Sequence, residues 1–190
     1  MRRGSNARRA PPGSVRIIAG EWRGRRIPIV AETAVRPTAD RVRETVFNWL
    51  QMKIEGARVL DLYAGTGALG FESLSRGATE AWFVEQDARL AEALYAQAET
   101  FGAKPRIVRQ DAAAFLRGRA PQRFDIAFLD PPYALPVEPL LGLMPAWLAE
   151  EGVVYVERPL PAGLPDLAAG DWLKRGRAGS VEYGLARFAV

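Results

Sequence analysis

The chain has 190 residues, which is enough for one well-buried domain and too few for two of ordinary size. It contains no Cys and no His, which excludes disulfides, thiolate metal sites, a cysteine nucleophile and the commonest general base. The net charge of +4 is unevenly placed, because residues 1–43 alone carry 11 Arg against 3 acids.

Residues 1–13 are expected to form a basic, disordered arm that either contacts a polyanion or is simply solvated. No apolar segment follows this arm, so we do not expect a secretory leader. Every apolar run in the chain is interrupted well before the ~20 residues that a bilayer span needs. The sequence therefore predicts a cytoplasmic protein that does not enter a membrane.

Residues 14–55 are predicted to form an N-terminal extension that consists of a β-hairpin and a helix. The hairpin strands are expected at about 14–19 and 25–30, joined by a turn that contains Gly.

The helix is predicted within "RPTADRVRETVFNWLQM", residues 36–52, where apolar side chains recur at helical spacing from a start at residue 38 or 39. The same spacing brings Arg36, Asp40 and Arg43 near one another, which favours local salt bridges.

From residue 57 onward, strand patterns alternate with helix patterns. Strands are predicted at 57–63, 80–86, 104–110, 123–130 and 153–159, and helices at 66–77, 87–102, 111–118 and 138–152, the last kinked or interrupted at Pro145. A final antiparallel pair is expected within 172–190, turning near Gly176 or Gly179. This alternation predicts an α/β, Rossmann-like fold: a mostly parallel, doubly wound sheet with helices on both faces and an antiparallel pair at its C-terminus.

The segment "DLYAGTGALGFE", residues 61–72, ends the first of these strands and opens a helix. Gly65, Gly67 and Gly70 fit the G-x-G-x-x-G pattern of dinucleotide folds, so the pattern alone leaves the cofactor open. Asp61 lies four residues before the first glycine, where a carboxylate can hold a cationic amino group but would repel a pyrophosphate. This acid favours S-adenosylmethionine over a dinucleotide.

Two further acids follow the ends of the next two strands. Glu85 comes ~20 residues after the glycines, where an acid accepts hydrogen bonds from ribose hydroxyls. Asp111 is placed to accept from an adenine amino group, with the N–H of Ala112 donating to the ring. Each acid has a structural alternative, a helix N-cap or an ordinary surface position.

The tetrapeptide "DPPY", residues 130–133, ends the fourth strand, at the edge where such a sheet binds ligands. Its prolines stiffen the chain, so that the Asp130 carboxylate, the Pro131 carbonyl and the Tyr133 ring can form one rigid site. The ring would stack on a planar base while the acceptors bind the hydrogens of an exocyclic amine and direct its lone pair at a methyl donor. The structural alternative is a Pro-rich turn.

The acid in this motif indicates which base is preferred. An ionised Asp only accepts hydrogen bonds, and guanine presents N1–H and N2–H as adjacent donors, whereas adenine and cytosine place an acceptor beside the amine. Guanine therefore fits Asp130 best, although a protonated Asp would also serve cytosine.

Four segments in this order resemble the RsmD family of class I S-adenosylmethionine-dependent methyltransferases: "RIIAGEWRGRRI", "RPTADRVRETVFNWL", "DLYAGTGALGFE" and "FLDPPY". The family methylates guanine N2 in 16S ribosomal RNA, and the resemblance runs from about residue 14 to the C-terminus. It implies S-adenosylmethionine as the cofactor, a catalytic domain at residues 56–190, and 16S ribosomal RNA as the partner, either free or within a 30S particle. We also expect a monomer without a metal site.

The resemblance further implies roles for individual residues. The cofactor would be lined by Asp61, Tyr63, Gly65, Thr66, Gly67, Glu85, Gln86, Asp111 and Ala112, with Arg36 and Thr38 closing over it. The catalytic clamp would consist of Asp130, Pro131, Pro132 and Tyr133.

In this light the basic hairpin and the following helix are expected to bind RNA. Phosphate contacts and base stacking would come from Arg16, Trp22, Arg23, Arg25, Arg26 and Arg41. The alternative for Trp22 is that its ring packs the hairpin on the body of the protein.

Three other functions stay open. A DNA or RNA amino-methyltransferase acting on adenine N6 or cytosine N4 would share the clamp, but no segment is long enough for the sizeable target-recognition region that the DNA enzymes usually carry. An NAD-dependent dehydrogenase would leave "DPPY" without a role. A non-catalytic RNA-binding module would leave the acids at the strand ends unexplained.

Overall fold

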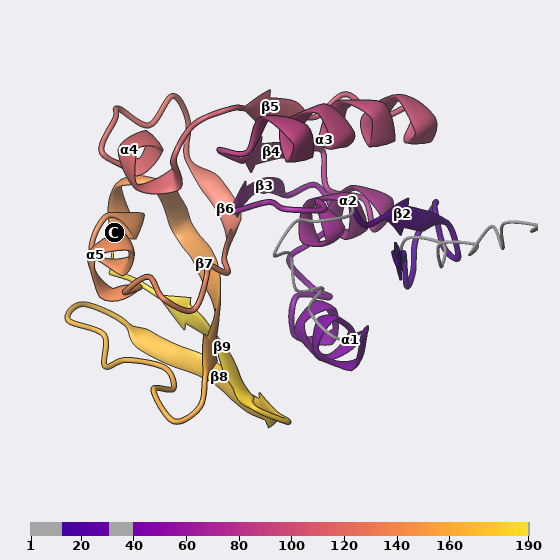
Figure 1. Ribbon diagram of the computed structural model, residues 1–190. Helices are drawn as coiled ribbons and strands as arrows, with labels where there is room; N and C mark the ends of the chain where they lie inside the picture. Colours follow the sequence, from indigo (N-terminus) through magenta and orange to yellow (C-terminus); the bar gives the residue numbers. More distant parts are fainter. Residues whose placement is uncertain (1–12, 31–39, 190) are drawn as a thin grey trace, which may run out of the picture.

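The computed structural model describes residues 13–30 and 40–189. Within these ranges the strands form a two-stranded sheet and a seven-stranded sheet (Figure 1). The small sheet is the predicted hairpin, with β1 at Ser14–Arg16 antiparallel to β2 at Arg26–Pro28. Its strands are shorter than the sequence pattern predicts.

The seven-stranded sheet has the order β5, β4, β3, β6, β7, β9, β8. Its strands are β3 (Arg58–Leu62), β4 (Glu80–Val84), β5 (Arg106–Val108), β6 (Phe124–Leu129), β7 (Leu148–Pro159), β8 (Asp171–Ala178) and β9 (Val181–Arg187). Strands β3 to β7 run parallel, and β9 runs antiparallel to both of its neighbours. The predicted Rossmann-like fold is confirmed, and the C-terminal pair turns at Gly179, which has a φ of 56°.

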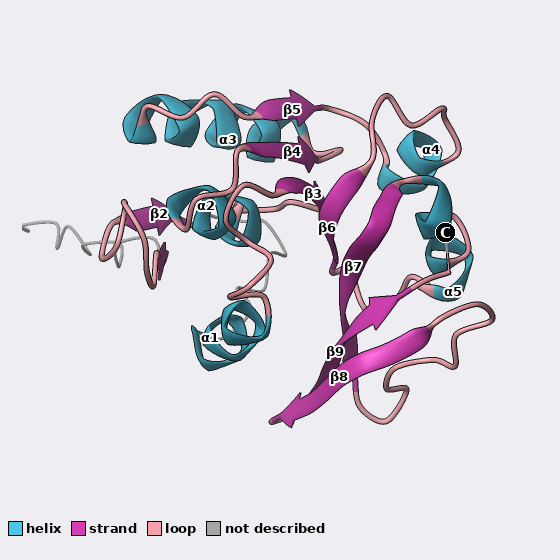
Figure 2. Cartoon of the chain, turned by 180° about the vertical axis from the view of Figure 1, so that it is seen from behind, coloured by secondary structure: helices cyan, strands magenta, loops and turns pink. Residues whose placement is uncertain are grey.

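The helices alternate with the strands as predicted (Figure 2). They are α1 (Asp40–Trp49), α2 (Ala68–Ser75), α3 (Ala88–Phe101), α4 (Ala112–Leu116) and α5 (Glu138–Leu141). None of the described helices is long and apolar enough to cross a membrane.

The prediction for residues 138–152 was wrong beyond its first turn. The helix ends at Leu141, Pro145 lies in a 3-10 turn at Met144–Ala146, and Leu148 already begins β7. Proline has no N–H and cannot continue the helix. The apolar residues of this stretch belong to a turn and still lie in the core. Trp147, for example, is buried, and its Nε1 donates a hydrogen bond to the carbonyl of Leu116, the last residue of α4, at 3.0 Å.

Apolar side chains form a core on each face of the large sheet. The hairpin, α1, α2 and α3 cover one face, and α4 and α5 cover the other (Figures 1 and 2). Strand residues alternate between the two cores: in β6, Ile126 and Phe128 belong to the first, and Ala127 and Leu129 to the second. The continuous apolar runs of the sequence therefore reflect burial on both faces.

The buried carboxylate of Glu72, on α2, fastens the hairpin to the rest of the molecule. Its oxygens accept hydrogen bonds from the backbone N–H groups of Ile18, at 2.7 Å, and Ala19, at 3.0 Å. Arg76 donates to the same carboxylate at 2.7 Å. Because Glu72 is fully buried, these donors replace the water that the carboxylate has lost.

Arg43 joins α1 to the same place. Its side chain is fully buried, and Nη1 lies 3.9 Å from an oxygen of Glu72. Its Nη2 donates to Asp40 at 2.6 Å and to the backbone carbonyl of Arg16 at 2.9 Å. The predicted pairing of Asp40 with Arg43 is confirmed, whereas Arg36 lies outside the described residues.

The parallel strands give the sheet two unlike edges. The carboxyl ends of β3 to β7 meet at one edge, called the carboxyl edge below, and their amino ends meet at the amino edge. In a doubly wound fold ligands bind at the carboxyl edge where the strand order reverses, which in this sheet falls between β3 and β6.

We expect Glu72→Gln to lower the free energy of unfolding by about 1 to 3 kcal/mol. An amide N–H would then face the N–H donor of Ile18 or Ala19, and the buried Arg43 would lose its negative neighbour. Urea unfolding measures the loss, with Glu44→Gln at an exposed position of α1 as the control. An unchanged unfolding midpoint would show that this carboxylate does not hold the hairpin.

Candidate active site

The loop between β3 and α2 turns sharply through left-handed backbone conformations. Tyr63, Gly65 and Gly67 have φ values of 60°, 56° and 75°. A Cβ on Gly67 would lie 2.6 Å from Leu94 and 2.8 Å from Phe71, so both packing and conformation require glycine there. Among the described residues Tyr63 alone has a positive φ without being glycine, and such strain is typical of functional loops.

Asp61 lies at the end of β3 and is only 3% exposed. Its Oδ2 accepts a hydrogen bond from the N–H of Gly70 at 2.9 Å. Burial raises the pKa of the Asp61 carboxyl well above its usual range; the Gly70 N–H opposes this rise, and the negative charges of Asp130 and Glu85 add to it. The three acids therefore share one electrostatic environment, which is suited to a cationic ligand.

Glu85 ties together the loops that follow β3 and β4. One of its oxygens accepts from the N–H of Gly65 at 2.8 Å, and the other from the N–H of Asp87 at 2.8 Å. Glu85 is buried, and its neighbour Gln86 is exposed. Because a carboxylate oxygen can accept more than one hydrogen bond, Glu85 retains acceptor capacity for ligand hydroxyls.

Asp111 is the N-cap of α4, the structural role that was the alternative to binding an adenine amino group. Its Oδ1 accepts from the N–H of Ala114 at 2.8 Å, and Ala112 behind it is buried. The pKa of the Tyr63 hydroxyl is raised by burial and then by the charge of Asp111, which places this acid close to the glycine loop. The cap uses one carboxylate oxygen, so capping and ligand binding are compatible.

The DPPY segment follows β6 at the carboxyl edge. Asp130 and Tyr133 are half-buried, Pro131 is buried, and Pro132 is exposed. The N–H of Leu135 donates to the carbonyl of Pro132 at 2.8 Å, which closes a turn. β3 and β6 are neighbouring parallel strands with Leu62 opposite Leu129, so this segment and the glycine loop leave the sheet at the same part of the edge.

Sequence reasoning missed three residues at the end of β7. Glu157 is buried and accepts hydrogen bonds from the hydroxyls of Tyr133, at 3.2 Å, and Tyr155, at 2.9 Å. Arg158 donates to the backbone carbonyls of Leu135, at 2.9 Å, and Tyr133, at 3.4 Å. The rule that located the other acids, a carboxylate at the end of a buried strand, also applies to "VVYVERP" and would have found Glu157.

The turn of the hairpin lies at the amino edge, away from these residues. The buried ring of Trp22 stacks on Phe101 with 4.7 Å between ring centroids, and its backbone N–H donates to Oγ of Ser75 at 2.9 Å. Ser75 ends α2 and Phe101 ends α3, and these helices lead to the amino ends of β4 and β5. Trp22 therefore packs the hairpin on the body of the protein, and its ring is occupied by Phe101.

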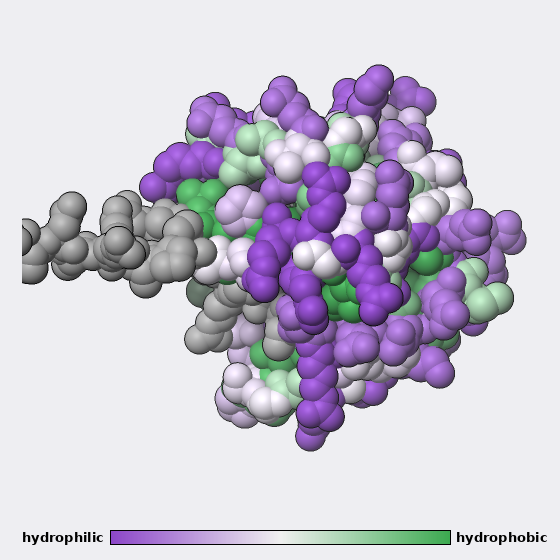
Figure 3. All heavy atoms as spheres, turned by 90° about the vertical axis from the view of Figure 1, so that its right-hand side faces the viewer, coloured by the Kyte–Doolittle hydropathy of each residue, from purple (hydrophilic) through white to green (hydrophobic). Residues whose placement is uncertain are grey.

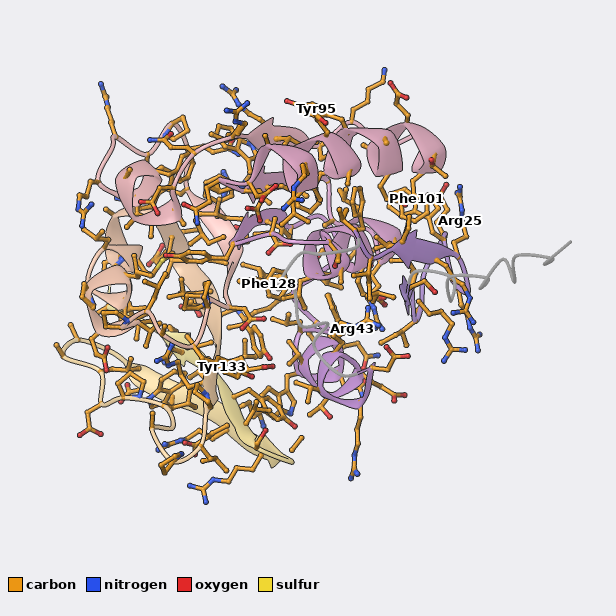
Figure 4. The ribbon with its side chains drawn as sticks, in the orientation of Figure 1. Arg25, Arg43, Tyr95, Phe101, Phe128 and Tyr133 are labelled. Carbon is orange, nitrogen blue, oxygen red and sulfur yellow. The ribbon has the colours of Figure 1, made fainter. Side chains whose placement is uncertain are left out.

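Arg25 is engaged at the same place. Its guanidinium lies 4.5 Å from the ring centroid of Phe101 and donates to the carbonyl of Thr100. Figure 4 shows Arg25 beside Phe101 and well apart from Tyr133. The hairpin turn is thus held against α3 by an aromatic stack and a cation over a ring.

Four other predicted RNA-binding residues have exposed side chains: Arg16, Arg23, Arg26 and Arg41. Figure 3 shows a largely hydrophilic surface on the side of the molecule that carries the hairpin. Arg36 and Thr38, which were expected to close over the cofactor, lie outside the described residues.

Comparison with known proteins identifies relatives over almost the whole chain. The family model described as conserved hypothetical protein 95 matches residues 15–187. The chain is 42% identical over 178 residues to the ribosomal RNA small subunit methyltransferase D of Escherichia coli, covering 91% of this chain and 89% of the relative. It is 38% identical to the protein of the same name from Haemophilus influenzae, covering 91% and 93%.

Solved structures agree with these sequence matches. The Escherichia coli protein yhhF superposes with a TM-score of 0.86 at 38% identity, covering 94% of this chain and 99% of that structure. The Thermus thermophilus 16S rRNA N2 G1207 methyltransferase superposes with a TM-score of 0.66 at 23% identity, covering 94% of this chain and 50% of that structure. The second likeness shows a common fold.

We expect Asp61→Asn to stabilise the ligand-free protein at neutral pH, because Asn keeps an acceptor for Gly70 and removes a buried charge. The Asp61 carboxyl has a raised pKa in the folded state, so its contribution to stability is fully present below the unfolded pKa and is lost as the pH rises through the folded value. The stability of Asp61→Asn relative to the wild-type protein should therefore be largest at neutral pH and decrease as the pH falls toward ~3.9.

Thermal unfolding of the two proteins across this pH range measures the effect. Asp125→Asn provides a control of opposite sign, since the bonds from Arg58 outweigh burial and lower the pKa of Asp125. A wild-type protein more stable than Asp61→Asn at neutral pH would contradict the expected cost of this carboxylate.

Proposed function

Because this chain belongs to the RsmD family, we propose that it transfers a methyl group from S-adenosylmethionine to the exocyclic N2 amine of a guanine in 16S ribosomal RNA. The observation that carries the proposal is that Asp61, Glu85 and Asp130 lie at the carboxyl ends of the adjacent parallel strands β3, β4 and β6, at one part of the carboxyl edge. Gly65 in the glycine loop and Gly70 in the first turn of α2 donate N–H groups to Glu85 and Asp61, and the DPPY clamp supplies the third acid.

The residues around the glycine loop fit the proposed cofactor. Asp61 is a buried carboxylate whose ionised form would be stabilised by a nearby cation. The amino group of the methionine part of the cofactor would provide this cation. Glu85 retains acceptor capacity for the ribose, and Asp111 with Ala112 would bind the adenine. When bound, S-adenosylmethionine supplies an electrophilic methyl group. Tyr63, Thr66 and Gln86 would complete the lining, and Arg36 with Thr38 would close over it.

In the clamp, Asp130 and the carbonyl of Pro131 would accept the two hydrogens of the guanine amine. Binding the hydrogens out of the ring plane favours the pyramidal amine and frees its lone pair for attack. As the bond between the amine nitrogen and the methyl carbon formed, the bond between that carbon and the cofactor's sulfur would break, and the positive charge would pass from sulfur to the nitrogen. Asp130 stabilises this charge, and the extra proton leaves afterwards. Tyr133 would stack on the base.

The proposed partner is 16S ribosomal RNA, either free or within a 30S particle, and the enzyme would act as a monomer in the cytoplasm. Arg16, Arg23, Arg26 and Arg41 would contact phosphates, since their side chains are exposed. The structure gives Trp22 and Arg25 other partners, so we do not extend the proposal to them.

Methylation of unmodified 16S ribosomal RNA and 30S particles with labelled cofactor tests the proposal. Nucleoside analysis should find N2-methylguanosine, and N6-methyladenosine or N4-methylcytidine would instead support the alternative amino-methyltransferases. We expect Asp130→Ala to lower kcat by about 10²- to 10³-fold, the usual effect of removing one preorganised transition-state contact. Unchanged function in this variant would favour a non-catalytic RNA-binding protein.

We expect the double variant Arg16→Gln, Arg41→Gln to weaken RNA binding at low salt and to reduce the slope of log affinity against log salt by roughly 1.5 to 2. Filter binding over a range of salt concentrations measures this slope. Arg25→Gln is the matched control, because its guanidinium is engaged by Phe101 and Thr100 and should affect stability instead. A loss of roughly 0.7 to 0.9 in the slope of this single variant, the value for one phosphate contact, would mean that the hairpin turn contacts the RNA.

A further inference from the structure

The last residues of β7 hold the DPPY segment from both faces of the sheet. Glu157 and Arg158 are consecutive in an extended strand, so their side chains point to opposite faces. Both contact the same short segment, Tyr133 to Leu135, which follows the clamp acid Asp130. No role in the methyl transfer proposed above has been given to either residue.

Glu157 fixes the far end of the Tyr133 ring. Glu157 is only 6% exposed, and its two carboxylate oxygens accept separate hydrogen bonds from Tyr133 and Tyr155. Tyr155 is fully buried on the same strand, so the carboxylate is oriented from within the core. The hydroxyl of Tyr133 is engaged by its hydrogen bond to Glu157. The part of this tyrosine that a base would contact is therefore its ring.

Arg158 fixes the backbone of the same segment. Arg158 is 7% exposed, and its guanidinium donates to the carbonyls of Leu135, at 2.9 Å, and Tyr133, at 3.4 Å. The N–H of Leu135 is also bonded, to the carbonyl of Pro132 at 2.8 Å. With two prolines before it, Tyr133 is therefore restrained at its carbonyl, at its hydroxyl and by the stiff chain that precedes it.

We propose that Glu157 and Arg158 are positioning residues that hold the Tyr133 ring in the orientation needed to stack on the target base. This inference rests on the proposed function. A preorganised aromatic platform increases catalysis because the base does not have to wait for, or induce, the reactive orientation. Glu157 acts through Tyr133, since its carboxylate is buried and both oxygens already accept from tyrosine hydroxyls.

A double-mutant cycle between Tyr133→Phe and Glu157→Leu tests this role on 16S ribosomal RNA and 30S particles. Tyr133→Phe removes only the hydroxyl and should lower kcat/KM by about tenfold, the effect expected when one hydrogen bond to a charged group is lost. Glu157→Leu should cost at least as much in the wild-type background and much less in the Tyr133→Phe background. Cofactor affinity, measured by calorimetry, should stay unchanged.

Matched variants separate positioning from a general loss of stability. Glu157→Gln keeps an acceptor for the Tyr133 hydroxyl and should recover most of the activity lost in Glu157→Leu. Glu182→Gln alters another buried acid, one that accepts from the N–H of Leu164 at 2.9 Å, and should lower the unfolding temperature while leaving kcat/KM within about twofold. Arg158→Lys keeps the charge but loses the planar guanidinium that donates to both carbonyls, and should lower kcat/KM by about as much as Tyr133→Phe does.

The outcomes that would overturn the inference are distinct from those that would overturn the proposed function. If Tyr133→Phe has wild-type kcat/KM, the bond to Glu157 does not matter, whatever happens to the folding of the Glu157 variants. If the two substitutions are additive in an active enzyme, Glu157 acts independently of Tyr133. If the wild-type protein methylates a nucleoside other than guanosine, or no RNA at all, the proposed function itself fails.

Discussion

A buried carboxylate must find hydrogen-bond donors inside the protein, and this single requirement organises the molecule. Asp61 accepts from Gly70, Glu85 from Gly65 and Asp87, and Glu72 from Ile18 and Ala19. Apart from the local bond between Asp87 and Glu85, each of these bonds joins a side chain on one element to the backbone of another segment. The acids at the carboxyl edge therefore also set the course of the loops around it, so the groups proposed to bind the cofactor also serve the structure.

Glu157 meets the requirement in a different way. Its donors are two tyrosine hydroxyls, and one of them belongs to the clamp. Burial raises the pKa of the Glu157 carboxyl, and the two hydroxyl bonds oppose that rise. A backbone donor fixes a loop, whereas a side-chain donor fixes a ring. The difference explains how one sheet edge can combine a tightly folded glycine loop with a tyrosine ring held by its hydroxyl.

The sequence was sufficient for the parts of the fold that repeat a simple pattern. The βα alternation and the acids at the strand ends follow from local chemistry and were found where they were expected. Residues 138–152 were mispredicted, because apolar residues in a turn can show the same spacing as a helix face. The packing of Trp22 on Phe101 depends on a contact between segments about eighty residues apart, which no local pattern encodes.

The last strand of the sheet, β8, has a consequence for the behaviour of the protein in solution. It occupies one margin of the seven-stranded sheet, and its exposed side chains include Lys174, Arg175 and Arg177, with an irregular register against β9 near Trp172. Two copies that approached margin to margin would bring like charges together along a kinked strand. The opposite margin, β5, is only three residues long. Neither margin of the sheet is thus a good template for strand addition, which disfavours edge-to-edge association of two folded copies.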